Sequence, residues 1–267
     1  MRWLIGLLLL CQAALAGAQT DPFPAIGSAY WLEIDSAPVW SRQADQRLAP
    51  ASLTKMMTAL LVLEQGSSVP ALQAIVRVSS AAASETGTRL ALKTGDQLTV
   101  GDLLAASLIA SANDACHALA DHIAGNQTQF VQHMNQRARQ LGMHNTHFTN
   151  ACGHDGPQHY SSAHDLALLA HALMQHAVAL ELAGLLERTI RTQGGSRHFV
   201  LKSTNALMGR YPGAVGLKTG RTPQAGNCLV ALARRGEHQV LLVLLNGTDR
   251  WWDSVDVLDL AFARANR

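Results

Sequence analysis

Hydrophobic and polar positions follow the period of β-strands near both ends of the chain and the period of helices between them. The turn-forming stretch Asp35–Pro38 separates the first two strand-like runs, and Gly236-Glu237 joins the last two as a hairpin turn. Trp251–Arg264 closes the chain as an amphipathic helix. Both ends are therefore predicted to supply strands, at 29–34, Val39–Trp40, 214–219, 227–233 and 239–245.

The longest apolar run of the middle region predicts a buried helix. From Leu53, the stretch LTKMMTALLVLE carries a single charge before Glu64, and Gly66 with two serines ends it. A helix without a polar face packs on all sides, so we expect it at the centre of the molecule. Two further helices are predicted at 127–141 and 163–174.

A break in the helical pattern is predicted near residue 112. The segment 100–125 contains two alanine- and leucine-rich pieces that meet at Ser-Ala-Asn-Asp, where Asn113 or Asp114 is expected to cap the second piece. Residues 144–162 are rich in Asn, Gly, His and Pro and predict a long loop, which in a compact domain is more often functional than idle. We therefore predict one α/β domain, with a sheet from both chain ends, flanking helices and an inserted helical section.

Composition excludes few classes of function. The 267 residues are 48% hydrophobic and 15% charged, which is typical of a globular protein of one large or two small domains. A net charge of +2, without a run of basic residues between aromatics, excludes nucleic acid as an expected partner.

The first eighteen residues are typical of a cleaved secretory signal. Arg2 precedes the apolar run Trp3–Leu10, and small residues allow cleavage after Ala16 or Ala18. A membrane anchor is the alternative, but the run is too short to cross about 30 Å of hydrocarbon. Cys11 follows leucines rather than the small residues of a lipidation site, so we expect an exported, soluble mature protein.

Cleavage of that segment would leave three cysteines, Cys116, Cys152 and Cys228. An odd number in an exported protein permits at most one internal disulfide, and the sequence does not say which two would pair. We interpret all three as small buried hydrophobic residues.

The start of the central helix carries a candidate nucleophile, Ser52, followed three residues later by Lys55. Ser52 as a helix N-cap is the alternative interpretation. A capping box would place Glu or Gln at Lys55, and a cation in the first turn opposes the helix dipole by roughly 0.3–1 kcal/mol. Apolar neighbours suggest that the amine is partly buried, which favours its neutral form. A neutral Lys55 on the same helix face could accept the proton of Ser52.

Two further candidates lie later in the chain. Ser111 and Asn113 alternate in the predicted break, so both could face one cleft while Ala112 packs behind them. The tetrapeptide Leu-Lys-Thr-Gly occurs twice, ending at Gly95 and at Gly220. The first copy runs into Gly-Asp before a helix and is interpreted as a solvated turn, whereas the second precedes an apolar strand.

Together these residues resemble the low-molecular-mass penicillin-binding proteins, the serine D-alanyl-D-alanine carboxypeptidases, whose signature is S-x-x-K, S-x-N and K-T-G in that order. The resemblance extends over most of the chain, through APASLTKMMTALLVLE, LIASANDACHALADHIAG, MNQRARQLGMHNTHFTN, HYSSAHDLALLA and YPGAVGLKTGRTPQAGNCLVALA. It implies a β-lactamase/transpeptidase-like fold for 19–267, with the helical insert at about 80–189 and 1–18 as signal peptide.

The resemblance also implies a role for each matching residue. Ser52 would be the acyl-enzyme nucleophile, Lys55 the general base and Ser111 a proton relay to the leaving amine. The substrate would be bound by Asn113, by the charge of Lys218, by the Thr219 hydroxyl and along Gly220, where a strand without a side chain allows close approach. The backbone N–H groups of Ser52 and Arg221 would form the oxyanion hole, and the charge of Lys218 would help to keep Lys55 neutral.

The sequence departs from the family pattern at several positions. Ala112 stands where many members have glycine, and Arg221 where an aromatic residue or histidine is common. The loop Asn150-Ala-Cys-Gly-His154 replaces Asn-Pro-x-Gly-Leu, which leaves its part in substrate choice open. The chain ends soon after the closing helix, so we expect no stable membrane anchor.

The resemblance implies removal of the terminal D-alanine from peptidoglycan stem peptides in the periplasm or outside the cell, inhibition by β-lactam antibiotics, and no cofactor. A DD-endopeptidase using the same residues is the closest alternative. A class A β-lactamase would need a glutamate loop that Glu181 and Glu187 do not match. The twelve histidines lack metal-ligand spacing, so no metal site is predicted. A non-catalytic wall-binding module is disfavoured because all the catalytic side chains of the family pattern are present. The sequence leaves the carboxypeptidase to endopeptidase balance, the third stem-peptide residue and the oligomeric state open.

Overall fold

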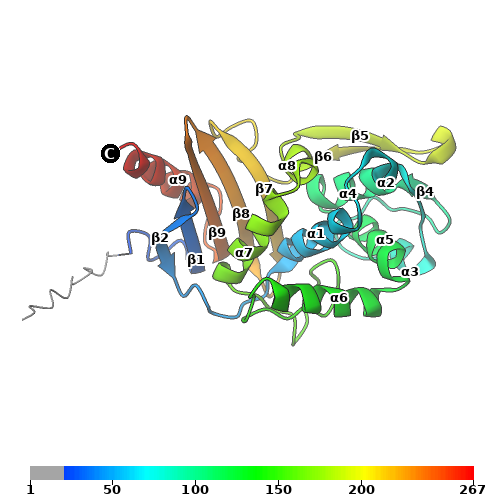
Figure 1. Ribbon diagram of the computed structural model, residues 1–267, viewed down its shortest axis with the longest axis horizontal. Helices are drawn as coiled ribbons and strands as arrows, with labels where there is room; N and C mark the ends of the chain where they lie inside the picture. The colour runs from blue at the N-terminus through cyan, green and yellow to red at the C-terminus, as the bar shows by residue number, and fades with distance from the viewer. Residues whose placement is uncertain (1–20) are drawn as a thin grey trace, which may run out of the picture.

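A computed structural model describes residues 21–267, and its centre is a five-stranded antiparallel sheet (Figure 1). The strand order is β2-β1-β9-β8-β7, so the first strands of the chain pair with the last, and Trp31 lies opposite Val243. The strands predicted from the sequence are confirmed. They are β1 (Gly27–Ile34), β2 (Ala37–Arg42), β7 (Ala214–Thr222), β8 (Gly226–Arg235) and β9 (His238–Gly247).

Helices gather mainly on one side of the sheet, with α1 among them (Figure 1). The helix α1 contacts α4, α5, α6 and α7, as its uniformly apolar sequence predicts. The helices are α1 (Lys55–Gln65), α2 (Val69–Gln73), α3 (Ser80–Ala83), α4 (Val100–Ile109), α5 (Asn113–Ala124), α6 (Gln127–Gln140), α7 (Ala163–Met174), α8 (Ala177–Ala183) and α9 (Trp252–Ala265), with 3₁₀ turns at Ala51–Thr54 and Gln193–Gly195.

The sheet is buried on both faces, which explains the unbroken apolar run in β9. Leu241, Val243 and Leu245 join the core on the side of α1 and α7. Val240, Leu242 and Leu244, the alternate residues, join a second core beneath α9. Side chains alternate between the faces of a strand, so a strand covered on both faces needs apolar residues at every position.

Two small two-stranded sheets were not predicted from the sequence. One pairs β3 (Ile75–Arg77) with β4 (Gln97–Thr99), and the other pairs β5 (Glu187–Arg191) with β6 (His198–Lys202). Both strands of the second sheet consist mainly of polar or exposed residues, with Ile190 and Leu201 as their buried members. A strand with one buried side chain carries little of the alternation by which strands are recognised.

The predicted cap of α5 is wrong, although the break between α4 and α5 is confirmed. Ala112 occupies the cap position, and no side chain caps the helix. The buried carboxylate of Asp114 instead accepts hydrogen bonds from the backbone N–H groups of Leu90, Leu92 and Ala115. Asp114 thus holds the segment before β4 against α5.

All three cysteines are buried, as interpreted from the sequence, but two of them are paired rather than free. Cys116 on α5 and Cys152 in the long loop form a disulfide, whereas Cys228 on β8 is a buried free thiol. The predicted signal segment lies outside the described residues. Within 21–267, no single helix is long and apolar enough to cross a membrane, and α7 with α8 reaches that length only as a pair bent by 109°.

The position of α1 predicts a large stability effect for its buried leucine. Leu60 is completely buried, so Leu60→Ala should lower the free energy of unfolding by about 2–5 kcal/mol through lost packing and a residual cavity. Leu260 on α9 is 39% exposed, and Leu260→Ala is the matched control, with an expected loss of about 1 kcal/mol or less. Urea denaturation of both variants measures the difference, and equal losses would contradict the central position of α1.

Candidate active site

The hydroxyl of Ser52 lies beside the amine of Lys55 at the start of α1. Ser52 belongs to the 3₁₀ turn that precedes the helix, and its Oγ is 3.0 Å from Lys55 Nζ. No side chain caps this turn or α1, so the alternative interpretation of Ser52 as an N-cap is wrong. The hydroxyl is left facing the lysine.

The Lys55 amine is completely buried and has three neighbours within hydrogen-bond distance. Besides Ser52 Oγ, it donates to Asn113 Oδ1 at 2.7 Å and to the carbonyl oxygen of Cys152 at 2.6 Å. A neutral amine has two N–H groups and one lone pair, and among these neighbours only the Ser52 hydroxyl has a proton to give. The two N–H groups therefore suit the oxygen acceptors, and the lone pair suits Ser52.

Burial lowers the pKa of Lys55 to about 7, although the negative charges of Glu85 and Asp114 act in the opposite direction. A lysine with this pKa is substantially neutral near physiological pH. The apolar neighbours of Lys55 in the sequence led us to expect a buried amine with its neutral form favoured, and the burial and lowered pKa agree with this expectation.

Ser111 and Asn113 both point toward lysine amines from the link between α4 and α5. Ser111 has a positive φ of 59°, and its Oγ accepts a hydrogen bond of 2.9 Å from Lys218 Nζ. Asn113 accepts from Lys55 and donates from Nδ2 to the carbonyl oxygen of Thr86 at 2.6 Å. Ala112 between them is completely buried, so the alternation expected from the sequence is present.

The second Lys-Thr-Gly copy lies on β7, the edge strand of the sheet. Lys218 is buried, and burial lowers its pKa well below the usual value, with repulsion from Lys55 and Arg250 acting in the same direction. The repulsion expected between the two lysines thus lowers the pKa of Lys218. The lowered pKa of Lys55 has burial as its main cause. Lys93 in the first copy is exposed, which confirms it as a solvated lysine near a turn.

Gly220 brings the edge strand against the turn that carries Ser52. A Cβ atom at Gly220 would lie 3.0 Å from the Ser52 backbone nitrogen and 3.1 Å from the Pro50 oxygen, closer than most side-chain contacts. Arg221, the next residue, has an exposed side chain and pairs with Asn227 on β8. The backbone groups of Ser52 and the end of β7 are therefore close neighbours.

Two residues next to this strand were missed by the sequence analysis. One is Thr204, whose Oγ1 lies 2.7 Å from Thr219 Oγ1. Arg250 donates from Nη1 to the carbonyl oxygen of Gly220 at 2.7 Å. Neither position carries a local signal, because each reaches β7 through the tertiary fold.

The long loop contacts the turn that carries Ser52 through Gly153. This residue has a φ of +89°, and a Cβ atom there would lie 1.9 Å from the Ala51 carbonyl oxygen and 2.9 Å from the Ser52 nitrogen. Asn150 Oδ1 shapes the loop by accepting hydrogen bonds from the N–H groups of Cys152, Gly153 and His154. Only glycine fits both the backbone angle and the space.

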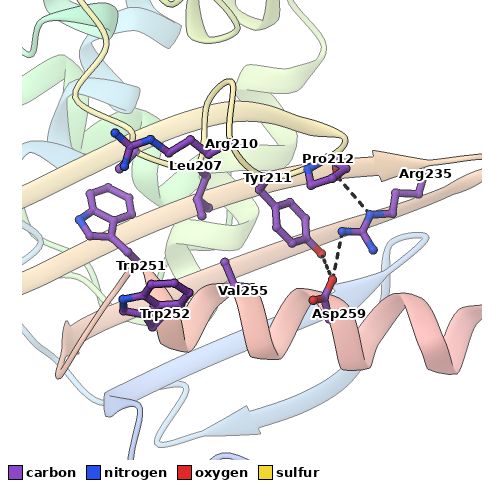
Figure 2. A pocket seen from close by; sticks show the side chains of 10 residues that line it. Leu207, Arg210, Tyr211, Pro212, Arg235, Trp251, Trp252, Val255 and Asp259 are labelled. Atoms are coloured by element: carbon purple, nitrogen blue, oxygen red, sulfur yellow. Dashed lines mark hydrogen bonds and ion pairs between the residues drawn. The ribbon is translucent and has the colours of Figure 1, made fainter.

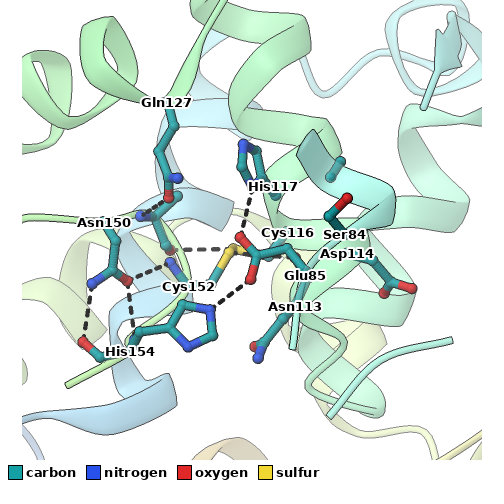
Figure 3. A network of polar contacts seen from close by, with 12 residues as sticks. Ser84, Glu85, Asn113, Asp114, Cys116, His117, Gln127, Asn150, Cys152 and His154 are labelled. Carbon is teal, nitrogen blue, oxygen red and sulfur yellow. Dashed lines mark hydrogen bonds and ion pairs between the residues drawn. A yellow bond between two sulfur atoms is a disulfide. The ribbon is translucent and has the colours of Figure 1, made fainter. Parts of the chain in front are cut away.

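A carboxylate between two histidines closes one side of the site (Figure 3). Glu85 Oε1 lies 2.6 Å from His117 Nδ1 on α5, and Oε2 lies 2.7 Å from His154 Nε2 in the loop. Burial raises the pKa of Glu85, but these hydrogen bonds outweigh burial and hold it at about 2. Within residues 21–267, no cluster of His, Cys, Asp or Glu has the geometry of a metal site.

A separate pocket lies on the α9 side of the sheet (Figure 2). Its volume is about 530 Å³, and Trp251, Trp252 and Leu207 form part of its lining. Asp259 at one end accepts hydrogen bonds from Tyr211 and Arg235. None of the candidate site residues lines it, so this pocket is separate from the candidate site.

The structure thus brings Ser52, Lys55, Ser111 and Asn113 together with the strand that carries Lys218, Thr219, Gly220 and Arg221. A hydroxyl beside a buried amine, facing a sheet edge, has the arrangement of a serine nucleophile with its base. The catalytic and binding roles expected for these residues stay predictions.

Comparison with known proteins gives a consistent result. The family described as D-alanyl-D-alanine carboxypeptidase matches residues 19–249. The carboxypeptidases DacF of Bacillus subtilis and DacC of Escherichia coli are 36% and 37% identical over 98% and 91% of this chain, which spans 70% and 63% of their lengths. The solved DD-transpeptidase of Streptomyces K15 is 31% identical with a TM-score of 0.84, covering 92% of this chain and 100% of its own.

The contact at Gly153 predicts a specific loss of Ser52 reactivity. In Gly153→Ala the new methyl group displaces the backbone beside Ser52, and we expect labelling by a fluorescent penicillin to slow about 100-fold. Gly142→Ala is the matched control, because Gly142 also has a positive φ, of 76°, but nothing lies within 4 Å of its Cβ position. The control should lose about 1 kcal/mol of stability and keep its labelling rate. Equal rates in the two variants would contradict the role of this contact.

Proposed function

Since this chain belongs to the D-alanyl-D-alanine carboxypeptidase family, we propose that it removes the terminal D-alanine of peptidoglycan stem peptides through an acyl-enzyme on Ser52. One observation carries the proposal: the Ser52 hydroxyl lies 3.0 Å from a buried lysine amine whose other two neighbours are acceptors. A serine hydroxyl needs such a base to become a nucleophile near neutral pH.

Acylation begins with proton transfer from Ser52 to neutral Lys55. The oxygen attacks the carbonyl carbon of the penultimate D-alanine, and the negative charge that develops on the carbonyl oxygen is stabilised by the N–H groups of Ser52 and Arg221. Collapse of the tetrahedral intermediate breaks the peptide bond. Its leaving nitrogen takes a proton that passes from Lys55 by way of Ser111.

Deacylation repeats these steps with water as the nucleophile. A water molecule gives a proton to neutral Lys55, and its oxygen attacks the ester carbonyl carbon. The ester bond then breaks, the shortened peptide leaves, and the proton passes from Lys55 to Ser52. Lys55 begins and ends the cycle as the neutral amine, so its protonation state controls both halves.

The substrate is expected to lie along β7 as an added strand. Its backbone would pair with the free edge of the sheet near Gly220, and its peptide group would bond Asn113 from the other side. The terminal carboxylate would meet Thr219 and Lys218. Because a carboxylate beside Lys218 favours the ammonium form, substrate binding would raise the lowered pKa of this lysine.

We assign this activity to residues 19–267 as one catalytic domain, with the helical section at about 80–189 and with 1–18 as a signal for export to the periplasm or the medium. β-Lactam antibiotics would acylate Ser52 in place of the peptide. A DD-endopeptidase would use the same residues on cross-linked peptides, and the nature of the digestion product separates the two activities.

The proposal predicts a covalent penicillin adduct on one residue. Incubation with a fluorescent penicillin followed by mass spectrometry should locate the label on Ser52, and Ser52→Ala should abolish it. Ser67→Ala, at an exposed serine just after α1, should label like the parent protein. Purified uncross-linked muropeptides should lose one D-alanine, whereas cleavage of cross-linked dimers alone would favour the endopeptidase. Labelling that survives Ser52→Ala would refute the assignment.

The lowered pKa of Lys55 predicts the acid limb of the pH profile. Because the base must be neutral, the acylation rate should fall about tenfold for each pH unit below about 7. Glu85 raises the pKa of Lys55, so Glu85→Gln should move the acid limb to lower pH. Glu64→Gln, at an exposed ion pair with Arg137, is the matched control and should leave it in place. A limb that moves upward in Glu85→Gln would contradict this account.

A further inference from the structure

We propose that the Cys116–Cys152 disulfide positions the catalytic base, because it joins the two chain segments whose oxygen atoms hold the Lys55 amine. The inference rests on the proposed role of Lys55 as general base. It gives the two cysteines a part in the reaction that neither their burial nor the sequence motifs indicated.

Both acceptors of the Lys55 amine are close to the disulfide along the chain. One acceptor is the carbonyl oxygen of Cys152 itself, at 2.6 Å from Nζ. The other is Oδ1 of Asn113, which precedes Cys116 by three residues on α5, on the same face of the helix. The sulfur bridge therefore links the loop acceptor to the helix acceptor through a short covalent path (Figure 3).

The position of these acceptors decides where the amine lone pair points. When both N–H groups of neutral Lys55 are directed at Cys152 O and Asn113 Oδ1, the lone pair faces Ser52 Oγ. If the loop carbonyl moves away, an N–H group is free to turn toward Ser52 instead. The base then donates to the nucleophile rather than accepting its proton, and the reactive arrangement is lost.

The disulfide also keeps water away from the amine. Cys116 and Cys152 are almost completely buried, and they pack where the loop meets α5 and α1. Thr58 on α1 donates to the Ala151 carbonyl oxygen at 2.6 Å, so the loop is fixed directly before Cys152 as well. Burial is the main cause of the lowered pKa of Lys55, and an opened loop would admit water and reduce that effect.

The charged groups around the Lys55 amine determine in which direction the pH dependence of acylation should change when the disulfide is removed. Glu85 before β4 and Asp114 on α5 favour the charged form of Lys55. Lys218 on β7 disfavours a second positive charge nearby, and His117 and His154 face Glu85 rather than the amine. Removal of the disulfide changes none of these charges. The acid limb of acylation should therefore move toward higher pH as the amine becomes better hydrated.

The test uses the double variant Cys116→Ser/Cys152→Ser in the full mature protein. Each sulfur lies near a backbone oxygen, that of Ala151 for Cys116 and that of Asn113 for Cys152, so serine hydroxyls have acceptors there and the variant is expected to fold. The acylation rate constant for a fluorescent penicillin at pH 8 should fall about 10- to 100-fold. The dissociation constant of the non-covalent complex should change much less than the rate, because the binding residues on β7 are not attached to the disulfide, although Asn113 is.

Cys228→Ala is the matched control, since Cys228 is an equally buried cysteine with no part in the disulfide, and it should keep the rate and the acid limb. A double variant with a lower unfolding temperature but the parent rate and acid limb would overturn the proposal and leave the disulfide a purely structural role. A parent protein that is not acylated on Ser52 would instead refute the proposed function itself.

Reduction of the parent protein gives a second measurement that does not depend on how the variant folds. Dithiothreitol supplies two electrons and two protons, converts the disulfide to two thiols and forms its own cyclic disulfide. Alkylation of quenched aliquots and mass spectrometry give the reduced fraction. The acylation rate should fall in proportion to that fraction and return on reoxidation. Full reduction with an unchanged rate would contradict the proposal.

Discussion

The buried amine of Lys55 is the interaction on which the rest of the site depends. Its neighbours come from the 3₁₀ turn before α1, from the start of α5 and from the long loop, which are far apart in the sequence. An amine removed from water must have its hydrogen-bonding groups met by the protein, so these three segments are held in fixed relation to one another. The same burial gives the amine the pKa that a base needs near neutrality.

The sheet supplies the opposite side of the site and is joined to the helical part by a second lysine. Lys218 on β7 bonds to Ser111 at the end of α4, so each of the two serines faces one lysine. Gly220 and Gly153 lack side chains where the edge strand and the loop approach the Ser52 backbone. The strand and the loop can therefore lie this close to Ser52 only because an added carbon at either glycine is absent.

Much of this arrangement was predictable from the sequence, and the failures have physical reasons. The strands of the main sheet and α1 were visible because both are buried and carry strong apolar patterns. The cap of α5 failed because Asp114 bonds to the backbone of a distant segment, which no local rule contains. The disulfide pairing and the contact between Thr204 and Thr219 depend on the fold, and β5 and β6 bury too few side chains to show a period.

The pairing of β1 with β9 has a consequence for the order of events while the chain is synthesised. Ser52 comes early in the chain, but Lys218 on the strand beside it follows more than 150 residues later, and the pairing of β1 waits for residues 240–247. Contacts between such distant segments form late in folding, because the intervening loop must close first. The surroundings of Ser52 are therefore complete only when almost the whole chain has been made.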